Sequence, residues 1–142
     1  MMDLTNVEWF DLFAARALAK LYESFPLAID FEPALDLIVA DGIELPRGEV
    51  QERGMQVIAI SEATIRWLVD EDFVRVSMND ARGRFFGCVL TSKGLSALRK
   101  IPPSVDGSKV TVGDSLRALA GTAIAAMAPD AVKAALANIW GA

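Results

Sequence analysis

The stretch from Ser61 to Lys100 constrains the fold more than any other part of the chain. Its apolar residues first recur at three- and four-residue spacing, which is typical of a helix with one buried side. They then alternate along two short runs that flank a polar turn, and finally return to helical spacing. The stretch therefore predicts a helix, a two-stranded hairpin and a second helix in direct succession.

The first helix of this stretch is predicted over residues 62–71, with Ser61 as its N-cap. Its buried side is predicted to consist of Ile65, Leu68 and Val69. Its exposed side is predicted to carry Thr64, Arg66 and Trp67. A packed Trp67 and a merely solvated Arg66 are the alternative interpretation. The acidic run 70–72 at the end of this helix would repel phosphate groups.

The hairpin is predicted from a strand over residues 73–78, a polar turn over 79–84 and a return strand over 85–90. Gly83 is available for a positive φ angle in the turn. The return strand is predicted to direct one face inward, formed by Phe86, Cys88 and Leu90. Cys88 is accordingly interpreted as a small core residue rather than a reactive thiol. Thr91 then opens the closing helix, in which Leu95 and Leu98 face the core.

The residues that close the hairpin resemble a known motif. Leu90-Thr91-Ser92-Lys93-Gly94, followed by Leu98, resembles the LT-x-KG signature of the MarR and PadR families of winged-helix regulators. Asp80-x-Arg82 resembles the wing motif of the MarR type. The chain also resembles an uncharacterised family of bacterial winged-helix proteins, which has a similar ending and a small C-terminal helical tail.

The resemblance implies a homodimer that holds double-stranded DNA with its wing and with the helix over residues 62–71, which corresponds to the third helix of these families. In the wing, it implies that Asp80 orients the turn and that Arg82 reaches the minor groove. The candidate DNA-binding residues are Thr64, Arg66, Trp67, Arg82, Arg84 and Lys93. The chain departs from these families in its short wing, its third helix with few basic residues and its acidic N-terminal half.

Three helical segments are predicted before this stretch. The first spans Asp3 to Tyr22, is capped by Thr5 or Asn6 and ends before Pro26. Its apolar residues at helical spacing are Val7, Phe10, Leu12, Phe13, Ala17, Leu18 and Leu21. We interpret it as core support, with a dimerisation helix that presents Trp9, Phe10 and Phe13 as the alternative.

The second helix is predicted from Asp30, its N-cap, to Val39, with Leu35, Ile38 and Val39 facing inward. The last of these segments covers residues 49–60, in which Val57-Ile58-Ala59-Ile60 would also suit a strand. We interpret it as a helix that runs on toward the helix that follows, although Gly54 weakens it.

The chain after Lys100 predicts a linker and a helical hairpin. Pro102-Pro103 ends the preceding helix, and Asp114 is the expected cap of the next one. Helices are predicted over residues 116–128 and 131–140, with Val132, Leu136, Ile139 and Trp140 on one side of the second. Both are shorter than the roughly 20 residues that span a membrane, so membrane insertion is not expected.

The predicted fold is mainly α with a small β-hairpin. It comprises a winged-helix domain over residues 1–101, a linker over 102–113 and a C-terminal helical hairpin over 114–142. The terminal helices are expected to support packing or self-association.

Composition argues against an enzyme. The chain has no histidine and one cysteine, which removes the commonest general base and the usual zinc ligands. No phosphate-binding loop or cofactor motif is visible, so no catalytic residue, metal or cofactor is expected. No signal peptide is visible and no intrachain disulfide can form, which indicates a cytoplasmic protein.

The charge distribution leaves two functions open. The net charge is −5, but residues 61–100 hold seven basic and five acidic residues. This distribution and the resemblance favour a DNA-binding transcriptional regulator that dimerises through its terminal helices. The alternative is a winged-helix module that makes protein–protein contacts and binds no DNA.

Overall fold

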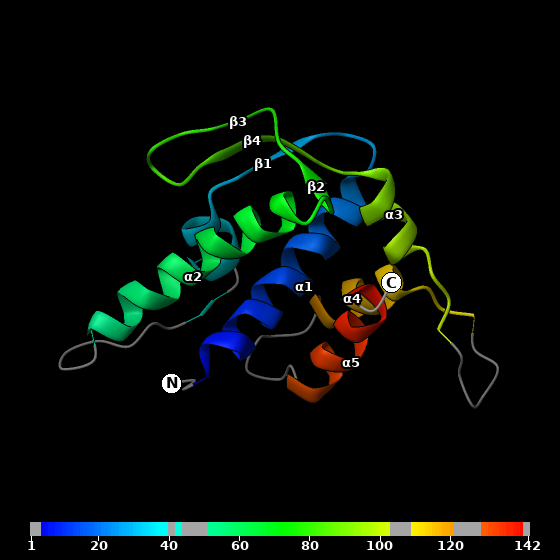
Figure 1. Ribbon diagram of the computed structural model, residues 1–142. Helices are drawn as coiled ribbons and strands as arrows, with labels where there is room; N and C mark the ends of the chain where they lie inside the picture. Colours follow the sequence, from blue (N-terminus) through cyan, green and yellow to red (C-terminus); the bar gives the residue numbers. More distant parts are fainter. Residues whose placement is uncertain (1–3, 40–41, 44–50, 103–108, 121–128, 141–142) are drawn as a thin grey trace.

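The computed structural model describes residues 4–39, 42–43, 51–102, 109–120 and 129–140 (Figure 1). The protein is mainly helical with a small antiparallel sheet, as predicted. Its helical elements are α1 (Asn6–Ser24), η1 (Ala34–Val39), α2 (Gln51–Asp70), α3 (Ser92–Leu98), α4 (Val112–Ala120) and α5 (Pro129–Trp140). Its strands are β1 (Ile29–Phe31), β2 (Val74–Arg75), β3 (Met78–Asn79) and β4 (Phe85–Leu90).

The first helix forms the centre of the core. Of its two predicted caps, Thr5 is the one used: its side chain accepts a hydrogen bond from the Glu8 amide, and the Glu8 carboxylate accepts one from the Thr5 amide. These hydrogen bonds hold the pKa of Glu8 below its ordinary value. Trp9 and Phe13 are buried within the chain, which agrees with core support, but Val7 is 64% exposed against expectation.

The prediction of one helix from Asp30 to Val39 is wrong in its first part. Asp30 does not cap a helix but lies in β1, and its side chain accepts a hydrogen bond from the Gly87 amide at 2.9 Å. Only η1, a π-helical turn, follows. A wider turn shifts which side chains face inward, so Leu37 and Ile38 are buried whereas Leu35 and Val39 are exposed.

The predicted helices on either side of Ser61 form the single helix α2. Ser61 is therefore not an N-cap. It is fully buried in the helix interior, where its hydroxyl donates to the Ile58 carbonyl oxygen at 2.6 Å. Ile65 and Leu68 are buried as predicted, and Val69 is half-buried.

The sheet is built around β4, which pairs antiparallel with β1 on one side and with β2 and β3 on the other. The predicted strand over 73–78 is thus two short strands. Ile29 pairs with Cys88 and Phe31 with Phe85, so the three residues 29–31 of β1 lie opposite the four residues 85–88 of β4. This is a β-bulge, and Gly87 has a positive φ angle within it.

The bulge corrects the predicted inner face of β4. Phe85 is buried before the bulge, and Cys88 and Leu90 are buried after it. Phe86, which was predicted to face inward, is only half-buried. The extra residue at the bulge shifts the alternation by one position, which sequence spacing alone does not reveal.

The C-terminal helices pack against α1 and share its core (Figure 1). The Asp114 amide donates to the Thr111 hydroxyl at 3.1 Å, so Thr111 takes the capping position that was predicted for Asp114. The buried residues of these helices include Val112, Leu116, Val132, Leu136 and Ile139. The predicted helix over 116–128 is seen as far as Ala120, and its remainder lies outside the described residues.

Candidate functional site

Thr64 was predicted to face solvent from the third helix, and this prediction is wrong. Its side chain is 1% exposed, and its hydroxyl donates to the Ile60 carbonyl oxygen of the same helix at 2.7 Å. Together with Ser61, Ile65 and Leu68 it forms the buried stripe of α2. Thr64 therefore cannot contact a base or a phosphate.

Trp67 belongs to an aromatic cluster that joins three parts of the chain. We define this cluster as Phe10, Trp67, Phe73 and Trp140. The Trp67 ring centroid lies 5.1 Å from that of Phe10 and 5.0 Å from that of Trp140, both edge to face, and 6.2 Å from that of Phe73. Since Trp67 is 36% exposed, part of its surface remains accessible.

Arg66 is exposed on α2, as predicted, and lies beside the hairpin. Its guanidinium carbon lies 6.0 Å from the centroid of the Phe85 ring. One turn earlier, the Glu62 carboxylate lies directly under the turn, where it would collide with a Cβ atom added to Gly83. The β3–β4 hairpin therefore runs along α2, as Figure 1 shows.

The hairpin turn is ordered by Asp80. Its carboxylate accepts hydrogen bonds from the Arg82 and Arg84 amides at 3.0 Å, and the Arg84 side chain pairs with it at 2.7 Å. These bonds, led by the Arg84 amide, hold the pKa of Asp80 below its ordinary value. Gly83 has a positive φ angle, as predicted. Arg84 also lies over the Phe86 ring, so its charge is already engaged.

Lys93 connects the closing helix to the end of α2. Its ammonium donates to the Glu71 carbonyl oxygen at 2.8 Å and lies 4.5 Å from the centroid of the Phe73 ring. Among the predicted DNA-binding residues, Arg66 and Arg82 carry charges with no hydrogen-bond or ion-pair partner among the described residues. Since Arg66 lies over the Phe85 ring, Arg82 is the one predicted base whose charge makes no hydrogen bond, ion pair or ring contact among the described residues.

An apolar groove lies between α1 and α2 and has a volume of about 280 Å³. Its lining residues, which define what we call the α1–α2 groove, are Asn6, Val7, Phe10, Ile60, Ala63, Thr64 and Trp67. The sequence did not reveal this groove because Val7 and Phe10 fit the helical spacing of core residues. Spacing shows which residues share a face, but it does not show where a neighbouring helix stops covering that face.

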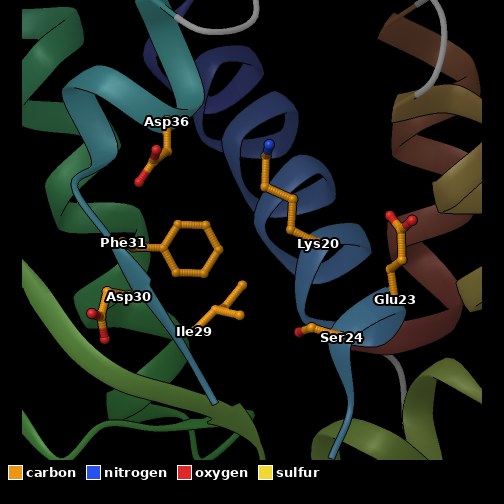
Figure 2. Close-up of a pocket in the computed structure, with 7 residues that line it drawn as sticks. All are labelled: Lys20, Glu23, Ser24, Ile29, Asp30, Phe31 and Asp36. Atoms are coloured by element: carbon orange, nitrogen blue, oxygen red, sulfur yellow. The ribbon is translucent and has the colours of Figure 1, made fainter. Parts of the chain in front are cut away.

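A second cavity, of about 360 Å³, lies between α1, β1 and η1 and was also not predicted. Figure 2 shows the residues that line it, which are Lys20, Glu23, Ser24, Ile29, Asp30, Phe31 and Asp36. No sequence motif marks it, because β1 approaches α1 only through its pairing with β4.

No group of three or more acidic or cysteine side chains in the described part of the chain is placed to hold a metal ion. Cys88 is buried, and burial raises the pKa of its thiol to about 11. None of the described helices has the length and apolar character needed to cross a membrane.

Comparison with known proteins gives no relative for this chain: no family model, curated protein or solved structure matches it significantly.

Proposed function

We propose that the chain is a winged-helix protein–protein interaction module whose α1–α2 groove receives an amphipathic, basic helix of a partner protein. The order of α2, hairpin and α3 supports the winged-helix assignment, since it follows the predicted order of helix, wing and closing helix. The observation that carries the proposal is the groove itself, which leaves apolar side chains of two neighbouring helices accessible to solvent.

The groove has the shape and chemistry that suit a helix. Its walls present Val7 and Phe10 of α1 and Ile60, Ala63 and Trp67 of α2, which recur at three- and four-residue spacing. Two parallel rows of this kind accept the side-chain ridge of a third helix. The small side chain of Ala63 allows such a helix to approach closely. An amphipathic helix would place its apolar side chains against Val7 and Trp67.

Charge favours a basic partner. The chain has a net charge of −5, and the exposed acidic run Asp70-Glu71-Asp72 begins three residues after Trp67, at one end of the groove. Acidic residues at the rim of an interface accelerate association with a basic partner and disfavour an acidic one. The same acidic run disfavours a nucleic-acid backbone at this end of α2.

A synthetic peptide would test this proposal. The probe is a lysine-rich helical peptide with leucines at positions i, i+3, i+4 and i+7, and a scrambled peptide of the same composition is its control. We expect the amphipathic peptide to bind about tenfold more tightly and to shift the Ile60 and Ala63 amide resonances. Val7→Lys should weaken binding by about tenfold, or 1.4 kcal/mol, through lost apolar contact and like-charge repulsion.

Val39→Lys is the matched control, because Val39 is 66% exposed but lies outside the groove. It should leave peptide binding unchanged. Equal binding of the scrambled peptide, or resonance shifts outside the groove, would contradict the proposal. If the protein instead forms a dimer that Val7→Lys dissociates, the occupant is a second copy of the chain.

DNA binding is the second candidate, and the uncommitted charge of Arg82 favours it. Arg82 is exposed at the hairpin turn that Asp80 orders. The resemblance to the MarR-type wing motif implies a minor-groove contact at this position. Of the predicted basic residues, Arg66 and Arg82 have no hydrogen-bond or ion-pair partner for their charges among the described residues, so we expect weak binding that depends on salt.

Fluorescence anisotropy on random duplex DNA, titrated with salt, measures this second function. Arg82→Gln should reduce the slope of log affinity against log salt by about one. Lys100→Gln, at an exposed position outside the hairpin, is the control and should leave the slope unchanged. An absence of binding at low salt would exclude a role in holding DNA.

A further inference from the structure

The cavity between α1, β1 and η1 combines opposite charges with an apolar surface (Figure 2). We propose that it binds a small zwitterion, a molecule with one ammonium group, one carboxylate group and a short apolar chain. A volume of about 360 Å³ falls within the range of small-molecule sites. The inference is independent of the α1–α2 groove, which lies elsewhere on α1.

Two opposite charges face the cavity without pairing with each other. Lys20 extends from α1 and Asp36 from η1, and Figure 2 shows their charged groups at the same end of the cavity on opposite walls. They form no ion pair, and Lys20 has no hydrogen-bond or ion-pair partner among the described residues. A ligand that carries both charges can pair with each: its carboxylate with Lys20 and its ammonium with Asp36.

The remaining lining residues select among possible ligands. Ile29 is half-buried and offers an apolar surface to an aliphatic chain, whereas Phe31 beside it is 2% exposed and adds little accessible surface. The carboxylates of Glu23 and Asp30 at the margin disfavour a molecule with only negative charge. One carboxylate oxygen of Asp36 accepts a hydrogen bond from the Glu32 amide at 2.7 Å, so the other oxygen is left for a ligand.

The cavity is linked to the hairpin through Asp30. Asp30 is a lining residue of the cavity, but Figure 2 shows its side chain on the side of β1 opposite to Ile29 and Phe31. There the side chain accepts the hydrogen bond from the Gly87 amide at the bulge of β4. A ligand near Asp30 changes the electrostatic surroundings of that amide. The amide resonance of Gly87 should therefore shift when a ligand binds in the cavity.

The test compares L-leucine with two molecules that each lack one of its charges. Isoamylamine has no carboxylate, and 4-methylpentanoate has no ammonium. In an NMR titration we expect leucine to shift the Phe31 and Gly87 amide resonances and to bind at least tenfold more tightly than either analogue. Lys20→Gln and Asp36→Asn should each weaken leucine binding by about tenfold. Glu32→Gln, a neighbouring carboxylate outside the cavity lining, should leave it unchanged.

Three results would overturn the proposal. Isoamylamine that binds as tightly as leucine would make the cavity a site for cations. Leucine binding that is unaffected by both Lys20→Gln and Asp36→Asn would place the ligand elsewhere. No shift of either reporter resonance at about 10 mM leucine, the weak end of ligand binding, would show that the cavity takes no such zwitterion. Peptide binding at the α1–α2 groove is measured separately and is unaffected by these outcomes.

Discussion

At the scale of single residues, burial determines the chemistry of the one cysteine. Cys88 is fully buried in β4, and its sulfur lies 3.6 Å from the Phe85 carbonyl oxygen. Burial disfavours the thiolate and raises the pKa to about 11. The thiolate is the nucleophilic form of cysteine, so this side chain contributes packing rather than reactivity at neutral pH.

The raised pKa of Cys88 predicts how stability depends on pH. Between the pKa of an unfolded cysteine, about 8.5, and about 11, the folded chain keeps a proton that the unfolded chain loses. The contribution of this group to the free energy of unfolding therefore falls as pH rises through that range. The melting temperature should decrease between about pH 8 and about pH 10.5, and this decrease should be larger in the wild type than in Cys88→Ala. Equal decreases in the two proteins would contradict the effect.

The polar residues of α2 show what could be predicted at this scale. The sequence correctly indicated that Ile65 and Leu68 face inward. It misplaced Thr64 because apolar character was used to find the buried side, whereas Ser61 and Thr64 satisfy their hydroxyls on carbonyl oxygens of their own helix. A hydroxyl bonded in this way can be buried at little cost, so polarity alone does not identify an exposed residue.

At the scale of elements, the bulge in β4 determines how the hairpin is presented. The φ angle of Gly87 is 65°, a value that residues other than Gly, Asn and Asp rarely adopt. A Cβ atom at this position would also meet the Ser77 side chain. The bulge shifts the side-chain alternation so that both Phe85 and Cys88 face the core.

Substitution of Gly87 should therefore destabilise the protein. We expect Gly87→Val to lower the free energy of unfolding by on the order of 1–3 kcal/mol, since a β-branched residue strongly disfavours positive φ. Gly87→Asn should cost less, because Asn tolerates this conformation. Urea denaturation of both variants measures the difference. A Gly87→Val protein as stable as the wild type would mean that β4 can lose its bulge.

Long-range pairing explains why some elements were predicted and others were not. The hairpin and the cap at Thr91 depend on residues close together in sequence, and both were predicted. The strand β1 exists because it pairs with β4, more than 50 residues later, which local spacing does not report. The cavity beside β1 was missed for the same reason, as its walls come from three separate elements.

At the scale of the whole molecule, the two ends of the chain share one core. The first helix packs against α2, α4 and α5, and Trp140 near the C-terminus contacts Trp67 of α2. Leu116 of α4 is fully buried in this core, whereas Leu27 is 73% exposed. The helices from α4 onward therefore stabilise the part of the chain that carries the groove and the hairpin.

This shared core predicts the effect of Leu116→Ala. Removing a fully buried leucine side chain should lower the free energy of unfolding by about 2–5 kcal/mol, whereas Leu27→Ala should change it by less than about 0.5 kcal/mol. Because α4 packs on α1, the loss should move one cooperative transition of the whole chain. Far-UV circular dichroism and tryptophan fluorescence report it together, since tryptophans lie in α1, α2 and α5. Two separate transitions, with only the first moved by Leu116→Ala, would mean that the C-terminal helices fold as an independent unit.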